Sequence, residues 1–334
     1  MDRLVVTGGL GFIGSNFIHH ILSNRSDLRV ANVDYEGPSS NPSNTSDLRR
    51  NKRYRHLKGN LAEPRIAKWV AKNADLVVHF AAETHVDRSI ANPRPFLESN
   101  ILGTYNLVDA LRNSKSQRLV HISTDEVYGS ANDGESFDEE SRLDPSSPYS
   151  ATKAASDQLV NAWIRTYKVP GMILRCTNNY GPYQHPEKLI PKTIIRGLND
   201  LQVPLYGGGM QVRDWIYVID FCTAIEKALE KGEVGQTYNV SAGNELTNKE
   251  VVQRILRQIG KPLSLIASTE DRPGHDVRYS LSSERARAKL GWRPRHEFEH
   301  ALGLTVKWYR ENENWWRPMA TRKTLSARPW KERW

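Results

Sequence analysis

Short apolar runs rich in β-branched residues alternate with amphipathic helical segments through the first half of this sequence. The predicted strands lie near residues 3–7, 28–33, 55–58, 75–80, 117–123 and 171–176. The predicted helices between them lie near residues 12–24, 63–73, 94–113 and 149–168. Because strands that alternate with helices form βαβ units, this rhythm predicts an α/β fold with a doubly wound parallel sheet of the Rossmann type.

The pattern becomes irregular after residue 177. Short strands are expected near residues 215–218, 237–241 and 263–266, and helices near residues 189–200, 219–231, 247–259 and 297–312. We therefore expect a second, smaller α/β lobe that is interleaved with the first. The expected division is a Rossmann domain at 1–177 with a returning segment at about 213–241, a substrate lobe at 178–312 and a tail at 313–334 that is rich in Trp and Arg.

Composition excludes several classes of protein. No run of some 18 uninterrupted apolar residues and no basic and apolar leader are present, so we expect a cytoplasmic protein with no membrane partner. Cys176 and Cys222 are the two cysteines, too few for a disulfide scaffold or a structural zinc site, and we expect no metal. The net charge of +9 fits nucleic acid or an enzyme with anionic ligands, but much of the excess lies in the tail.

A glycine triplet follows the first predicted strand. Gly8, Gly11 and Gly14 lie where the strand gives way to a helix, and Asp34 ends the second strand twenty residues later. This arrangement permits a tight turn and close approach of the backbone to a pyrophosphate. An acid at position 34 binds both ribose hydroxyls and repels a 2′-phosphate, which favours NAD over NADP. The alternative is a glycine-rich turn without a ligand, which this context makes the weaker interpretation.

Tyr149 and Lys153 open the helix predicted at 149–168, and their spacing of four places both on one face. A lysine ammonium beside a phenol stabilises the phenolate and so lowers its pKa from about 10 toward neutrality. Tyr149 could then act as a base on a sugar hydroxyl. Such a pair also occurs by chance on many helices, but downstream of a dinucleotide fingerprint the catalytic interpretation is favoured.

Three polar residues, Thr124, Asp125 and Glu126, follow the apolar strand predicted at 117–123. Ligands in parallel sheets bind beyond the carboxyl ends of the strands, which is where these groups fall. Adjacent carboxylates could form a solvated turn. Next to a redox site they indicate an acid and a base for an elimination, one protonating a leaving hydroxyl while the other removes a carbon-bound proton.

Together these motifs resemble those of the dTDP-glucose 4,6-dehydratases, a family of extended short-chain dehydrogenases/reductases. The resemblance covers most of residues 1–310 and also rests on the segments 81–89, 178–183, 186–191 and 271–276. The triplet at 124–126 separates this family from the related 4-epimerases, which share the fold and the Tyr/Lys pair but lack the acid pair. The sequence departs from the family at Asn60, Thr84, Ser99 and the loop after Asp34.

The resemblance implies three groups of site residues and a homodimer that pairs the helices near 94–113 and 149–168. The catalytic group is Thr124, Asp125, Glu126, Tyr149 and Lys153. The NAD group is Gly8, Gly11, Phe12, Ile13, Gly14, Asp34, Asn60, Leu61, Ala81, Ala82, Ser99, Tyr149, Lys153 and Asn179. The nucleotide-sugar group is Thr84, Thr124, Asn178, Glu187, Lys188, Leu189, Pro204, Tyr206, Arg213, Asn248, Arg272 and His275.

The implied reaction belongs to deoxysugar and rhamnose biosynthesis. It converts dTDP-glucose to its 4-keto-6-deoxy product by oxidation at C4, loss of water across C5 and C6, and hydride return to C6. The nearest alternative is a 4-epimerase or a dehydratase for another nucleotide sugar such as UDP-glucose. An alternative from another class is a Rossmann-type binding or regulatory protein that contacts nucleic acid through its basic tail, although a binding module has no need of the catalytic set, and we expect no nucleic acid partner.

The tail contains four of the nine tryptophans: Trp315, Trp316, Trp330 and Trp334. Exposing so much aromatic surface to water is unfavourable, so we expect the tail to fold back onto the body or across a dimer partner.

Overall fold

The computed structural model describes residues 2–334, and its centre is a sheet of seven strands in the order β10-β6-β5-β4-β1-β2-β3. The strands are β1 (Asp2–Thr7), β2 (Leu28–Asp34), β3 (Tyr54–Lys58), β4 (Leu76–His79), β5 (Arg118–Thr124), β6 (Gly171–Cys176) and β10 (Thr237–Val240). All the neighbouring pairs are parallel. The strand order reverses direction at β1, so the predicted doubly wound Rossmann-type sheet is confirmed.

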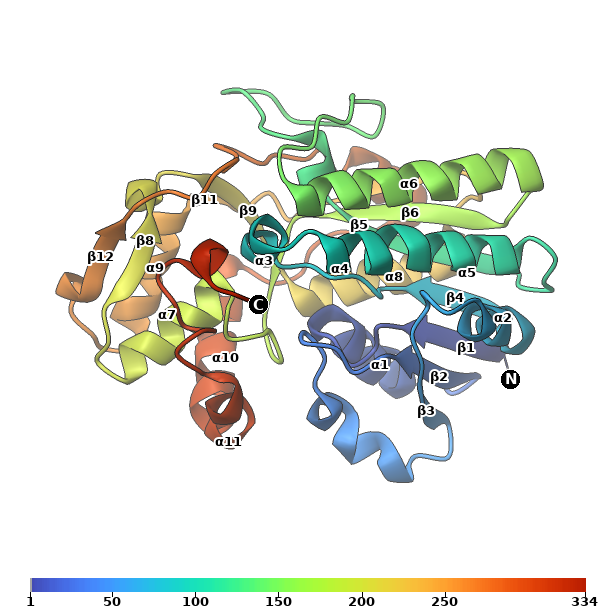
Figure 1. Cartoon of the computed structure of the whole chain (residues 1–334), viewed down its shortest axis with the longest axis horizontal. Helices are drawn as coiled ribbons and strands as arrows, with labels where there is room; N and C mark the ends of the chain where they lie inside the picture. Colours follow the sequence, from blue (N-terminus) through green and yellow to red (C-terminus); the bar gives the residue numbers. More distant parts are fainter. Residues whose placement is uncertain (1) are drawn as a thin grey trace.

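Helices cover both faces of this sheet (Figure 1). The alternation of side chains along β1 explains why: Leu4 and Val6 pack with α1 (Phe12–Asn24) and α8 (Val218–Lys231), while Val5 packs with the opposite layer. That layer consists of α2 (Pro64–Asn73), α5 (Gly103–Leu111) and α6 (Pro148–Tyr167). The helix predicted near 94–113 begins as α4 (Arg94–Phe96) and passes through a π-helical turn, η2 (Leu97–Leu102), into α5.

The second lobe has its own small sheets and its own apolar core (Figure 1). One sheet joins β7 (Asn178–Tyr180), β9 (Val212–Tyr217) and β11 (Glu245–Thr247), and the other pairs β8 (Val203–Tyr206) with β12 (Ile266–Thr269). Its helices are α7 (Leu189–Leu198), α9 (Asn248–Gln258) and α10 (Phe298–Glu311). Their apolar stripes meet in a cluster that includes Ile194, Ile255 and Tyr309.

Several short elements differ from the sequence-based expectation. The strand expected near 263–266 is wrong: the turn η5 (Leu263–Leu265) occupies most of it, and β12 starts only at Ile266. The loop after Asp34 leads into a 3-10 segment, η1 (Pro42–Arg50), and α3 (Val86–Ala91) was not predicted. A helix of six residues is too short to show a 3.6-residue period. The remaining short turns are η3 (Asp125–Tyr128), η4 (Gly207–Gly209) and η6 (Ala286–Leu290).

The tail folds back onto the body, as its tryptophans predicted. It contains α11 (Glu313–Trp316), η7 (Arg317–Met319) and η8 (Pro329–Lys331), and it ends beside α3 in Figure 1. Trp316 and Trp330 are 4% and 7% exposed. Within residues 2–334, no helix has the length and apolar character needed to cross a membrane.

Candidate active site

A single cavity runs between the two lobes at the carboxyl ends of the sheet strands. Every residue named above for the catalytic, NAD and nucleotide-sugar groups lines it. The ends of β1, β2, β4 and β5 supply the side chains of the first lobe, while the segments around β7, β8 and β9 supply those of the second. The fold therefore brings together residues more than 200 positions apart in the sequence, although their individual roles stay predictions.

The glycine turn between β1 and α1 has a geometry that only glycine permits at two positions. Gly8 has a φ of 73°, and a Cβ there would lie 2.6 Å from the backbone nitrogen of Ala81. A Cβ on Gly14 would lie 2.5 Å from the carbonyl oxygen of Gly8. The backbone is therefore open to a ligand at the N-terminus of α1, where the helix dipole favours a pyrophosphate.

Asp34 anchors the loop that follows β2. Its Oδ2 accepts a hydrogen bond of 3.0 Å from the backbone of Leu10, and its Oδ1 accepts bonds from the backbone of Glu36 and the hydroxyl of Ser40. The carboxylate thus ties the glycine turn to the loop after β2 and keeps acceptor capacity for a ribose. No arginine lines this end of the described cavity, so no guanidinium lies there to receive a 2′-phosphate.

Unpaired buried polar atoms are a second feature of the cavity that fits a bound dinucleotide. Two buried polar atoms along it, Oγ of Ser39 and Oδ1 of Asn179, have no hydrogen-bond partner within the described chain. Buried polar atoms are almost always paired in native proteins, so these two atoms mark positions where a polar ligand belongs. The residues present therefore fit NAD, which contributes ribose hydroxyls and a carboxamide.

The acid pair lies directly at the end of β5. The Thr124 hydroxyl caps η3 by accepting the backbone N–H of Glu126 at 3.3 Å, and it donates to Oδ1 of Asp125 at 3.0 Å. Burial, with the charge of Glu126 beside it, raises the pKa of Asp125 well above its usual value. Asp125 is thereby kept in the protonated form that an acid catalyst needs, and its buried Oδ2 has no partner in the described chain.

Glu126 faces the second lobe across the cavity. Its Oε2 lies 3.4 Å from the hydroxyl of Tyr279. Burial raises the pKa of Glu126, whereas the positive charges of Arg272 and Lys188 oppose that rise. Because the pKa of Asp125 is raised well above its usual value and the rise for Glu126 is opposed by two cations, Glu126 is the residue of the pair that ionises first, which suits one base and one acid on adjacent residues.

Tyr149 and Lys153 project from the first turns of α6, which begins with a capping box between Ser147 and Ser150. The Lys153 ammonium donates to the carbonyl oxygen of Ile122 at 2.8 Å, and burial lowers the pKa of Lys153 to about 8. The expected lowering of the Tyr149 pKa is not seen in the protein alone. Burial is the main reason that the pKa of Tyr149 is raised instead, and the charge of Glu126 adds to it, so that the two outweigh any stabilisation of a phenolate.

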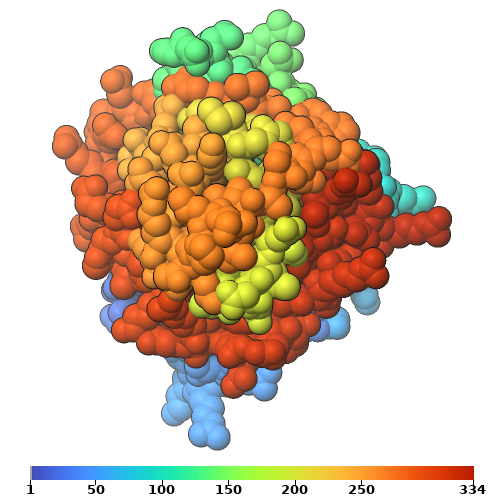
Figure 2. Space-filling view, turned by 90° about the vertical axis from the view of Figure 1, so that its left-hand side faces the viewer, coloured from blue at the N-terminus to red at the C-terminus, as the bar shows by residue number. Residues whose placement is uncertain are grey.

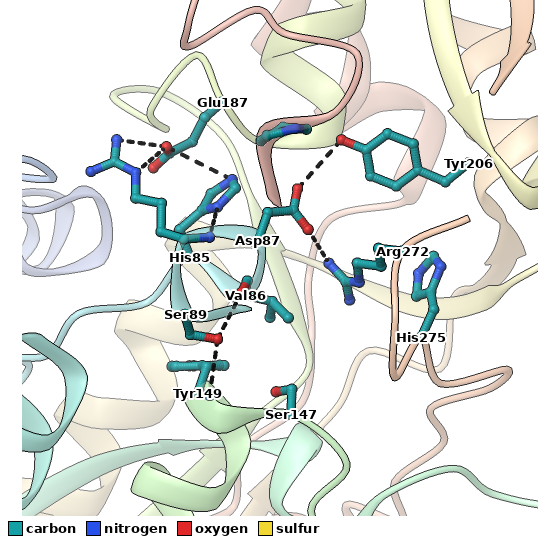
Figure 3. A network of polar contacts seen from close by, with 12 residues as sticks. His85, Val86, Asp87, Ser89, Ser147, Tyr149, Glu187, Tyr206, Arg272 and His275 are labelled. Atoms are coloured by element: carbon teal, nitrogen blue, oxygen red, sulfur yellow. Dashed lines mark hydrogen bonds and ion pairs between the residues drawn. The ribbon is translucent and has the colours of Figure 1, made fainter. Parts of the chain in front are cut away.

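The wall of the nucleotide-sugar end contains a connected set of buried charges (Figure 3). The Asp87 carboxylate pairs with Arg272 at 3.0 Å and accepts a long hydrogen bond from Tyr206 at 3.4 Å. The Arg88 guanidinium pairs with Glu187 at 2.6 Å. Nε of Arg272 is buried without a partner in the described chain, so it is free to bind an anionic ligand.

Comparison with known proteins identifies the family. A family model described as GDP-mannose 4,6 dehydratase matches residues 5–305. A dTDP-glucose 4,6-dehydratase from Streptomyces niveus is 43% identical over 334 residues, covering 98% of each chain. The structure of DesIV, a dTDP-glucose 4,6-dehydratase from Streptomyces venezuelae with NAD bound, has a TM-score of 0.93 at 42% identity and covers 95% of this chain and 99% of its own. The chain belongs to the dTDP-glucose 4,6-dehydratase family.

Epimerases share the architecture of this dehydratase. A UDP-glucose 4-epimerase from Thermus thermophilus, solved with NAD, has a TM-score of 0.85 at 31% identity and covers 93% of this chain and 99% of its own. The fold alone therefore does not separate the two reactions. Asp125 and Glu126, the acid pair expected from the sequence to separate them, line the same cavity as Tyr149.

Sequence reasoning missed several residues that line or support the cavity of this dehydratase. Asp87 lies inside the quoted segment 81–89 but had no assigned role, and its partner Arg272 is 185 residues away. The Ser89 hydroxyl, in the same segment, accepts the backbone N–H of Tyr149 at 3.1 Å and so joins α3 to the start of α6 (Figure 3). Tyr279 lies three residues past the segment 271–276, and no sequence motif includes it.

No metal site accompanies these groups in the described part of the chain: residues 2–334 hold no cluster of three or more His, Cys, Asp or Glu side chains that could bind an ion.

Proposed function

We propose that the protein converts dTDP-glucose to dTDP-4-keto-6-deoxyglucose by oxidation at C4, loss of water across C5 and C6, and reduction at C6. The observation that carries the proposal is the pairing of Asp125 and Glu126 at the end of β5, in the same cavity as Tyr149 and Lys153. A simple dehydrogenase or an epimerase has no use for an acid and a base beside the redox site. Names and structures of the relatives support dTDP-glucose as the substrate.

NAD is the proposed cofactor, and when bound it supplies the oxidation at C4 and the reduction at C6 within one turnover. The backbone of the Gly8 to Gly14 turn would hold its pyrophosphate, Asp34 the adenosine ribose, and Asn179 the nicotinamide end. Lys153, held by the Ile122 carbonyl, would bind the nicotinamide ribose. A closed cavity would also keep the reactive intermediate away from water.

The catalytic side chains divide the proton transfers among them. Tyr149 takes the proton of the sugar 4-hydroxyl, for which the positive charges of bound NAD and of Lys153 would have to stabilise its phenolate. Thr124 orients that hydroxyl. Oxidation at C4 makes the C5 hydrogen acidic, and Glu126 removes it. Asp125, whose raised pKa keeps it protonated, gives its proton to the departing 6-hydroxyl, so water leaves. Glu126 then returns its proton to C5. The proton that Tyr149 took from the 4-hydroxyl replaces the one that Asp125 gave to water, so all three side chains are restored for the next turnover.

The nucleotide-sugar residues would be supplied mainly by the second lobe. Arg213, Arg272 and Lys188 place positive charge around the end of the cavity remote from Asp34, as a diphosphate requires. We include in the proposal the division into an NAD-binding domain at 1–177 with the segment 213–241, a nucleotide-sugar lobe at 178–312 and the tail at 313–334. The separate apolar cores of the two lobes support it.

The proposal also includes a cytoplasmic homodimer. Leu97, Leu102 and Tyr105 leave 49%, 42% and 40% of their surfaces exposed on the η2 and α5 segment, which lies beside α6. An apolar face on two adjacent helices suits pairing with a second copy. Both cysteines are free and buried, which suits a reducing compartment. Light scattering of the purified protein tests the dimer.

A product assay tests the reaction. The purified protein is supplied separately with dTDP-glucose, UDP-glucose and GDP-mannose, and the products are analysed by mass spectrometry and NMR. We expect loss of one water and a new C6 methyl group from dTDP-glucose, with much slower reaction of the other two. A 4-epimer without loss of water would instead identify an epimerase. Conversion of UDP-glucose alone would show that the substrate carries UDP in place of dTDP.

A further inference from the structure

The last residues of the chain pack against the nucleotide-sugar end of the cavity. Residues 323–334, which we call the strap, pass along the second lobe and end beside α3 (Figures 1 and 2). In Figure 2 the tail, in red, lies directly against the yellow surface of that lobe. The strap itself contributes no residue to the cavity lining, so any effect on a ligand has to pass through the residues that it contacts.

Trp330 supports one of these residues directly. Its ring packs edge-on against Tyr206 with 4.9 Å between the ring centroids, and it is 7% exposed. Tyr206 lines the cavity, and its hydroxyl reaches the Asp87 carboxylate that pairs with Arg272 (Figure 3). Trp330 therefore holds in place the ring of Tyr206, whose hydroxyl contacts the buried charges in the cavity wall.

Trp334 supports a second part of the same wall. The guanidinium carbon of Arg88 lies 4.3 Å from the centroid of the Trp334 ring, and the Lys323 ammonium lies 4.9 Å from the same ring. The Trp334 indole also donates to the carbonyl oxygen of Pro329 at 2.8 Å, which folds the end of the strap into a compact turn. Arg88 in turn holds Glu187, whose carboxylate lines the cavity.

A third contact ties the strap to a buried cation. The Lys192 ammonium donates to the backbone carbonyl of Ser326 at 3.3 Å, and Lys192 also lines the cavity. Two of the three contacts reach Tyr206 and Lys192, which line the cavity, and the other reaches Arg88, which pairs with the lining residue Glu187. In the described chain, none of the contacts made by Ser326, Trp330 or Trp334 reaches a residue assigned to NAD.

We infer that Trp330 and Trp334 are positioning residues for the nucleotide-sugar site. They hold Tyr206 and the Arg88–Glu187 pair in the arrangement that binds the nucleotide sugar, without touching the substrate or the cofactor. This inference rests on the proposed function of the cavity. It assigns the two halves of the site to different parts of the chain. The strap affects the affinity for the nucleotide sugar, whereas the glycine turn and Asp34 bind NAD without it.

Steady-state kinetics of tryptophan variants test this role. Trp330→Ala and Trp334→Ala should each raise KM for dTDP-glucose, by about tenfold given the usual strength of a partly buried cation–π or aromatic contact, with kcat within about twofold. The amount of NAD that copurifies should not change. Trp330→Phe and Trp334→Phe should restore a KM near the wild-type value, and Trp334→Leu should not, because leucine has no aromatic face for Arg88.

Trp69→Ala is the matched control. Trp69 also lies under a guanidinium, that of Arg55 at 5.0 Å, but it belongs to α2 and lies outside the cavity. Its loss should leave KM unchanged. Equal KM values in wild type, Trp330→Ala and Trp334→Ala would overturn the inference, as would a parallel fall in kcat and NAD content, since that pattern reports general unfolding.

Hydrogen exchange separates failure of this inference from failure of the proposed function. The amides of Ser89 and Asn92, bonded to the carbonyls of His85 and Arg88, should exchange faster in Trp334→Ala than in Trp69→Ala. That measurement needs no substrate, so it remains valid even if dTDP-glucose is not turned over by the wild-type protein. Unchanged exchange in α3 would contradict the positioning role whatever the substrate is.

Discussion

The Tyr279 hydroxyl lies 3.4 Å from Oε2 of Glu126 and 2.6 Å from Oδ2 of Asp276, so it stands between the proposed C5 base and a second carboxylate. Asp276 lies on the loop after β12, whereas Glu126 follows β5. The negative charge of Asp276 raises the pKa of Glu126, and the positive charge of Arg272 lowers it. Charges on the second lobe therefore shift the pKa of a base that the first lobe supplies.

This relationship predicts opposite shifts of the pH profile. A base acts only when ionised, so kcat should fall as pH drops through the Glu126 pKa. Asp276→Asn removes a charge that raises this pKa and should move the acid limb to lower pH. Arg272→Gln removes a charge that lowers it and should move the limb to higher pH, together with a higher KM. The measurement is kcat against pH at saturating dTDP-glucose.

The control for this profile is Asp133→Asn, which removes a carboxylate from an exposed loop. Its acid limb should coincide with that of the wild-type protein. Shifts of the same sign in Asp276→Asn and Arg272→Gln would show that the limb reports a group other than Glu126.

Glu126→Gln should separate oxidation from elimination. The amide keeps the size and polarity of the side chain but cannot take the C5 proton, so turnover should fall by about 10²–10⁴-fold. Oxidation at C4 can still occur, and the absorbance of reduced cofactor should therefore build up after substrate is added. In Tyr149→Phe the first proton transfer is lost, and no such absorbance should appear. Normal turnover by Glu126→Gln would make Glu126 a turn residue without a catalytic role.

Asp34 is predicted to select NAD against NADP. Asp34→Ala should bind NADP more tightly relative to NAD, because it removes the charge that repels a 2′-phosphate. It should also lower the melting temperature, since the backbone N–H of Leu10 loses its acceptor, at a cost of about 1–3 kcal/mol. Asp34→Asn keeps an acceptor oxygen without the charge, so it should relax cofactor choice at a smaller cost in stability. Titration with both dinucleotides and thermal melts measure the two effects.

Local patterns made much of this site predictable. The glycine turn, Asp34 and the Tyr149/Lys153 spacing each depend on a few consecutive residues or on one helical turn, and the structure places all of them in one cavity. The segment 263–266 was misassigned as a strand because its apolar residues suit a strand and a turn equally well. Short apolar runs carry no period long enough to decide between them.

Contacts between distant segments could not be predicted. Tyr279 meets Glu126 across 153 residues, and Asp87 meets Arg272 across 185. Nothing in the sequence near either residue specifies such a partner, because the contact depends on how the second lobe docks on the first. The strap is an intermediate case. Its tryptophans predicted that it would pack somewhere, but only the structure places Trp330 on Tyr206.

The last prediction concerns where the hydrogen from C4 goes, because epimerases, dehydrogenases and dehydratases share this fold and differ in that outcome. An epimerase returns it to C4, and a net dehydrogenase releases it in free reduced cofactor. With Asp125 available to protonate the 6-hydroxyl and Glu126 to remove the C5 proton, this protein should deliver it to C6 of the same sugar. The test uses dTDP-glucose deuterated at C4, mixed with unlabelled substrate, and mass analysis of the product's methyl group.

Deuterium should appear in that methyl group only in molecules that began with it, because a cofactor that stays bound throughout the turnover has no other acceptor within reach. Asp125→Asn provides the control: it should slow the appearance of the methyl group without releasing label to solvent, since protonation of the leaving hydroxyl is then impaired but the C4 hydrogen stays on the enzyme. Scrambling between labelled and unlabelled molecules would show that reduced cofactor escapes during turnover. Label that stays at C4 would exclude delivery to C6 and point to epimerisation.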